Sequence, residues 1–92
     1  YFARKLNELT GQPVVVENKP GASAMIGAAT AARAAPDGYT VLITTNTTHA
    51  ANEHLYKTLT YHPVKDYAPI SLLGKGGQIM VVNPGSPAKT VG

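Results

Sequence analysis

The chain has 92 residues, a formal net charge of +3 and no cysteine. This length allows at most one small domain, and the lack of cysteine excludes a disulfide framework, a thiolate metal site and a thiolate nucleophile. The basic residues form no stripe and are not interleaved with aromatic side chains, which argues against a nucleic-acid-binding protein. A mildly basic surface does suit an anionic small ligand.

The two ends of the sequence lack the signals of a complete domain. Tyr1 already stands within a helical pattern, and the final residues 90–92 carry no stop signal. No signal peptide is present, and no apolar stretch approaches the roughly 18 residues that span a bilayer. We therefore expect a fragment of a longer protein.

The first predicted element is a helix. Phe2, Leu6 and Leu9 recur at helical spacing and place one apolar stripe on it, and Gly11 and Pro13 follow in the usual order of stop signals. Because such a stripe needs a surface to cover and a strand pattern follows, we expect this helix to pack on a sheet. The first strand of that sheet would lie upstream of the chain.

The next segments predict a βαβ unit. Val14–Val16 and Thr40–Thr44 are unbroken apolar runs, typical of strands covered on both faces. Between them, the small residues of Ala22–Ala35 predict a helix with Arg33 in its last turn, ended by Pro36–Gly38. The expected fold class is α/β, with a parallel or mixed sheet and flanking helices.

The remaining elements are less regular. Ala50–Leu59 has helical character, with Thr47 or Thr48 as the expected N-cap, and Tyr61–Pro69 is expected to be an irregular connection because of its prolines. Two further strand candidates, which local signals would allow to pair as a hairpin, are Ile70–Leu73 and Gln78–Asn83. Residues 84–92 are expected to form a loop that leads into another helix.

The candidate binding residues lie in two loops, 18–24 and 45–49. In open α/β sheets ligands bind outside the carboxyl ends of the strands, where both loops would lie. The first loop also supplies a helix N-terminus whose N–H groups can hold an anion, although a turn that merely caps the helix is the alternative. The predicted ligand-binding residues are Gly21, Ala22, Ser23, Ala24, Thr45, Asn46, Thr47, Thr48 and His49.

Familiar cofactor and metal motifs are missing. Gly21 and Gly27 do not give the dinucleotide-binding spacing, and no Gly-Lys-Ser/Thr motif follows. His49 and His54 are five residues apart, which does not place them on one helical face as metal ligands. We therefore expect no cofactor and no metal.

An enzyme is the main alternative from another class. Ser23, His49 and Asp66 would suit a hydrolase triad, but no G-x-S-x-G elbow is present. Four tyrosines are expected to pack with their rings and to expose their hydroxyls to solvent, rather than to stack against a ligand. They are Tyr39, Tyr56, Tyr61 and Tyr67. We expect no catalytic residue.

Several blocks of sequence, in order, resemble the Bug family of bacterial extracytoplasmic solute receptors, the binding proteins of tripartite tricarboxylate transporters. The resemblance covers nearly all of the chain. The blocks are Gly11–Ala22, Ala34–Thr40, Thr48–Ala50, Leu55–Lys57, Pro63–Ser71 and Val81–Pro84.

The resemblance implies a type II periplasmic-binding-protein fold, in which two α/β domains close on a small carboxylate. The chain would be most of the first domain, without its opening strand and without the second domain. The family's second and third binding loops match Gly21–Ala24 and Thr45–His49, although Met25 and Thr47 stand where the family usually has Asn and Gly. Location in the periplasm and membrane transporter subunits as partners follow from the same resemblance.

Three functions therefore remain open. The leading one is a carboxylate-binding receptor, and its rivals are a hydrolase that uses Ser23 and His49 and the effector-binding domain of a transcription regulator, which shares the general fold by analogy. If residues 1–92 form a separate polypeptide, we expect weak ligand binding, because half of the donors are missing, and self-association through an uncovered sheet edge.

Overall fold

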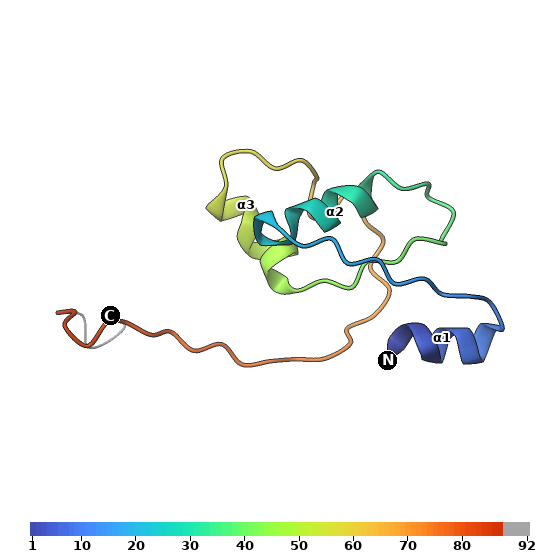
Figure 1. Cartoon of the computed structure of the whole chain (residues 1–92). Helices are drawn as coiled ribbons and strands as arrows, with labels where there is room; N and C mark the ends of the chain where they lie inside the picture. The colour runs from blue at the N-terminus through green and yellow to red at the C-terminus, as the bar shows by residue number, and fades with distance from the viewer. Residues whose placement is uncertain (88–92) are drawn as a thin grey trace.

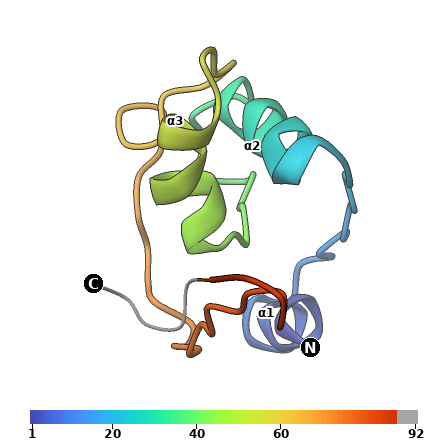
Figure 2. The ribbon, with the colours of Figure 1, turned by 90° about the vertical axis from the view of Figure 1, so that its left-hand side faces the viewer.

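Short helices joined by long extended segments make up the computed structural model, which describes residues 1–87. The elements are α1 (Phe2–Thr10), the 3₁₀ turn η1 (Ala22–Ala24), α2 (Met25–Ala32), the π-helical turn η2 (Thr47–Ala51) and α3 (Asn52–Leu55). α2 and α3 lie side by side, whereas α1 lies apart from them (Figures 1 and 2).

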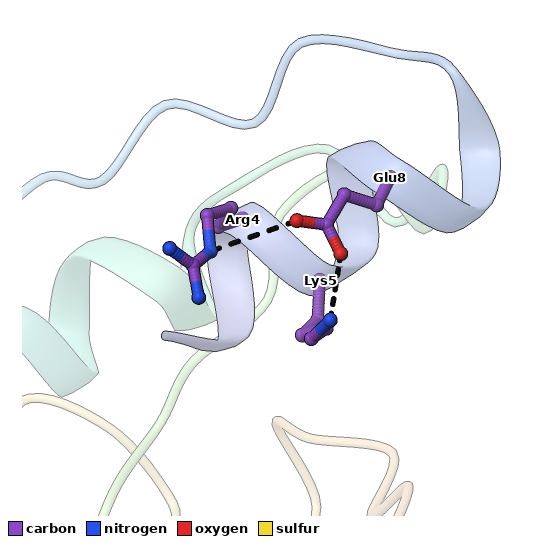
Figure 3. A network of polar contacts seen from close by, with 3 residues as sticks. All are labelled: Arg4, Lys5 and Glu8. Atoms are coloured by element: carbon purple, nitrogen blue, oxygen red, sulfur yellow. Dashed lines mark hydrogen bonds and ion pairs between the residues drawn. The ribbon is translucent and has the colours of Figure 1, made fainter.

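α1 confirms the first predicted helix. It ends at Gly11, whose left-handed conformation (φ 69°) lets its N–H donate to the carbonyl of Asn7 at 2.8 Å. Arg4 and Lys5 form exposed ion pairs with Glu8, at 3.6 and 2.8 Å (Figure 3). Such exposed pairs contribute little to stability.

The prediction that the apolar stripe of α1 packs on a sheet is not borne out among residues 1–87. Leu9 is 82% exposed, and Phe2 and Leu6 are exposed as well. None of the residues of this helix is buried. The helix is therefore specified mainly by local propensity and its C-cap, since the rest of residues 1–87 buries none of its side chains.

The predicted parallel or mixed sheet is unconfirmed, since residues 1–87 contain no strand. Val14–Val16 and Thr40–Thr44 are extended, but the expectation that both their faces are covered is wrong: Val15 is 88% exposed and Ile43 61%. A strand exists only when a neighbour pairs its backbone N–H and C=O groups. Here a groove lies between the two segments instead.

The small-residue segment forms a shorter helix than predicted. α2 begins at Met25 rather than Ala22, because the preceding three residues are left-handed. It ends at Ala32, so that Arg33 is its C-cap rather than part of its last turn. Pro36 disfavours a helical conformation for the residue before it, which is consistent with this early end.

The second helical region also differs in its bounds. η2 and α3 together span Thr47–Leu55, and the chain becomes extended at Tyr56 instead of continuing to Leu59. The N-cap is Asn46, which makes no side-chain capping bond, so the prediction of Thr47 or Thr48 is wrong. Thr48 is fully within the helical turn, with its side chain buried.

A small core holds α2 against the later chain. Its buried members are Ala28, Ala29 and Tyr61, with Met25, Ala32, Leu42, Leu59 and Tyr67 packed around them. The small side chains that follow Ile26 on α2 permit this close approach. The predicted packing role is confirmed for Tyr61, whereas Tyr39 is 91% exposed.

The rest of the chain is open. Tyr61–Pro69 is irregular, as predicted, and the strand candidates Ile70–Leu73 and Gln78–Asn83 are extended and exposed without strand pairing. The radius of gyration is 17.1 Å, against about 12 Å for a compact domain of this length. No helix in the described part is long and apolar enough to cross a membrane. The loop expected over residues 84–92 falls largely on residues 88–92, outside the described part.

Candidate functional site

The first predicted loop forms a strained left-handed turn. Gly21 has φ 114°, and Ala22, Ser23 and Ala24 have φ of 47°, 52° and 64°. Left-handed backbone costs a non-glycine residue roughly 1–2 kcal/mol, so three in succession need support from outside the turn. The turn leads directly into α2 at Met25.

That support comes from α3. The side-chain amide of Asn52 donates to the carbonyl of Ser23 at 3.1 Å, and the hydroxyls of Ser23 and Tyr56 lie 2.8 Å apart. Asn52 has no exposed surface. The backbone of Ser23 is thereby held by the first residue of α3 and its side chain by the C-cap residue Tyr56.

The second predicted loop is anchored to the segment that follows α3. The Tyr61 hydroxyl donates to the carbonyl of Thr48 at 2.7 Å and accepts from Asn52 at 3.3 Å. His49 Nδ1 lies 2.8 Å from the carbonyl of Pro63, and since a carbonyl only accepts, this nitrogen carries the proton. The two loops are therefore connected through Asn52 and Tyr61.

A groove of about 650 Å³ lies between the two extended segments and α2. Three of the nine predicted site residues line it, namely Ala24, Thr45 and Thr48. The other six do not: they are Gly21, Ala22, Ser23, Asn46, Thr47 and His49. One of the two ring nitrogens of His49 already forms a hydrogen bond with the carbonyl of Pro63.

The groove includes two charged residues that are not among the nine predicted ligand-binding residues. Glu17 and Lys19 line it and form an ion pair at 2.7 Å. Their position directly after Val14–Val16 was the available signal, since residues at the end of a predicted strand are candidates for a site. An added Cβ at Gly27 would lie 3.4 Å from the Lys19 carbonyl, so this glycine lets Lys19 approach α2 closely.

Tyr67 ties the irregular segment to α2. Its hydroxyl donates to the carbonyl of Ala28 at 2.8 Å, and its ring meets the ring of His49 edge to face at 4.8 Å. Burial, with smaller contributions from Tyr61 and Asp66, raises the pKa of Tyr67 to about 12. Tyr67 therefore remains a neutral hydrogen-bond donor at physiological pH.

The residues of the hydrolase alternative do not form a hydrogen-bonded triad. The Ser23 hydroxyl pairs with Tyr56, His49 pairs with Pro63, and Asp66 accepts from the backbone N–H of His62. The described part of the chain also contains no group of three or more acidic or histidine side chains placed to hold a metal. The arrangement suits binding through backbone and hydroxyl groups.

Comparison with known proteins identifies the family. The sequence model of the family described as "Tripartite tricarboxylate transporter family receptor" matches residues 1–92. The chain belongs to this family. The resemblance to Bug proteins is confirmed by Protein BugT of Bordetella pertussis, which is 37% identical to it over 84 residues.

Two further relatives have names that state no function. A UPF0065 protein of Bordetella pertussis is 36% identical over 84 residues, and one of Cupriavidus necator is 37% identical over 91 residues. BugT and these two cover 90%, 91% and 98% of the chain, but the chain covers only 26%, 26% and 27% of them. It thus spans about a quarter of the length of these relatives. No solved structure matches the chain significantly.

Membership of the receptor family implies a periplasmic-binding-protein fold. The described residues supply two helical loops and a groove of such a fold, without its sheet.

Proposed function

We propose that the complete gene product is a periplasmic receptor that captures a small carboxylate and passes it, unchanged, to the membrane subunits of a tripartite tricarboxylate-type transporter. The observation that carries this proposal is the family match over residues 1–92. It is supported by the hydrogen bonds that connect the two candidate binding loops.

The proposed ligand site comprises the two loops at the ends of the extended segments. No side chain caps the N-terminus of α2, so its first N–H groups and positive dipole end suit a carboxylate. Thr45 and Thr48 lie on the groove that Ala24 also lines. A second domain, outside residues 1–92, would supply the remaining donors.

The extended segments are the proposed strands of the family's fold. Val15 of the first segment and Thr40–Thr44 line the same groove, and the backbone groups of both segments take no part in strand pairing among residues 1–87. We propose that a strand from outside residues 1–92 pairs with them in the complete gene product. The structure described here would then be most of one binding domain.

Thermal unfolding tests the proposal. Melting of the complete gene product is followed with acetate, succinate and citrate, with glycerol as the uncharged control. A receptor gains stability as RT ln(1 + [L]/Kd), so at least one acid is expected to raise the Tm in a saturable manner. Equal Tm values with the acids and with glycerol would contradict carboxylate binding.

A further inference from the structure

Asn52 lies at the junction of the two candidate binding loops. We infer that Asn52 is a positioning residue: its buried amide fixes the left-handed turn η1 against the turn η2, and so sets the geometry of the ligand site. This inference rests on the proposed function. No motif or periodicity in the sequence singles out Asn52.

The directions of the hydrogen bonds fit this role. The two N–H groups of the Asn52 amide are directed to the Ser23 carbonyl (3.1 Å) and to the Tyr61 hydroxyl (3.3 Å). The Tyr61 hydroxyl in turn uses its own hydrogen to donate to the Thr48 carbonyl (2.7 Å). Each hydrogen is used once, and the chain of bonds runs from the backbone of η1 to the backbone of η2.

The turn η1 needs contacts from other parts of the chain to keep its left-handed conformation. Ala22, Ser23 and Ala24 are left-handed without being glycine, a conformation that persists only where surrounding contacts enforce it. Asn52 is the first residue of α3 and follows η2 directly. The helix that continues from the second loop therefore enforces the conformation of the first, as the adjacency of α2 and α3 in Figures 1 and 2 illustrates.

Affinity is the first measurement. The complete gene product is titrated calorimetrically with whichever of acetate, succinate and citrate it binds best. Asn52→Leu keeps the volume but removes both donors, and we expect about tenfold weaker binding. The matched control is Asn7→Leu on α1, whose amide donates to the Gln12 carbonyl away from the loops and whose loss should leave affinity unchanged. Affinity of Asn52→Leu within twofold of the wild type would overturn the inference.

Glycine rescue separates positioning from packing. If Asn52 acts by enforcing the left-handed turn, then Ala22→Gly with Ala24→Gly should restore most of the affinity of Asn52→Leu, because glycine adopts this conformation without strain. If Asn52 acts only through packing of the core, the glycines will restore nothing, which would overturn the inference. Tyr56→Phe removes the other contact of Ser23 at an exposed position, so it tests the same turn with little risk to folding, and it should also weaken binding.

A crystal structure of the Asn52→Leu variant without ligand decides the question independently of binding. We expect residues 22–24 to leave the left-handed region. A turn that stays left-handed, at its original place against η2, would overturn the inference regardless of the measured affinities for the acids. If instead the wild type binds none of the acids, the proposed function fails, while this structure still decides the role of Asn52.

Discussion

Gly21 is the residue at which backbone conformation and packing both demand glycine. Its φ is 114°, and an added Cβ would lie 3.0 Å from Cδ1 of Ile26. Because Gly21 also has ψ 158°, a backbone region that is essentially restricted to glycine, Gly21→Ala is expected to lower the free energy of unfolding of the complete gene product by more than Gly38→Ala does. Gly38→Ala is the matched control, because Gly38 has φ 82° with no atom within 4 Å of the added Cβ. Equal losses of the two variants in urea denaturation would contradict this difference between Gly21 and Gly38.

Tyr67 gives a residue-level prediction about pH. Its pKa is about 12 in the folded protein against 10.0 for a free tyrosine, so between these values the unfolded state has released a proton that the folded state retains. The contribution of Tyr67 to the free energy of unfolding is therefore fully present below pH 10, and it is lost as the pH rises toward 12. At pH 8, Tyr67→Phe should cost about 0.5–1.5 kcal/mol for the bond to Ala28.

The wild type and Tyr67→Phe should therefore converge in stability above pH 10. Denaturant titrations of both proteins at several pH values measure the difference. A difference that stays constant from pH 8 to 11.5 would mean that the pKa of Tyr67 is not raised by folding.

At the scale of elements, the sequence predicted what is determined locally. The spacing of Phe2, Leu6 and Leu9 and the stop signal at Gly11 correctly predicted α1. The strands are unconfirmed because strand pairing depends on neighbours, which no local pattern in Val14–Val16 supplies. Each element that was placed correctly depends on its own residues.

The same limit applies to the candidate site. Both loops were proposed as binding loops from the sequence, which stays a prediction, but the left-handed turn at Ala22–Ala24 was not predicted, since Ala and Ser carry no signal for that conformation. Asn52 and Tyr61 were missed as connectors because their roles arise from contacts with residues 9 to 29 positions away. Sequence patterns reveal such partners only when the fold is known.

The packing of α2 provides a prediction for an element. Ala28 is 1% exposed beneath Tyr61 and Tyr67 in the core, so Ala28→Leu should force these side chains apart and cost about 1–3 kcal/mol. Ala35→Leu, at an exposed position after the helix, should change stability by less than about 0.5 kcal/mol. Urea denaturation of both variants of the complete gene product measures this, and equal effects would contradict the close packing of α2.

At the scale of the whole molecule, residues 1–87 leave much apolar surface uncovered. Leu9, Val15 and Ile70 are each more than 80% exposed, and the extended segments lack strand partners among residues 1–87. Unpaired strand groups beside apolar surface promote pairing with another chain. We expect residues 1–92, made alone, to form dimers or larger assemblies, and light scattering that finds a cooperative monomer of 9.6 kDa would contradict this.

The central claim is that this chain is part of a receptor that binds a small carboxylate without transforming it. The most direct measurement is calorimetric titration of the complete gene product and of residues 1–92 with acetate, succinate and citrate, followed by NMR of the recovered acid. We predict saturable binding by the complete gene product, binding by residues 1–92 too weak to reach the micromolar range, and an acid recovered unchanged. Conversion of the acid, or the absence of binding to the complete gene product, would contradict the account.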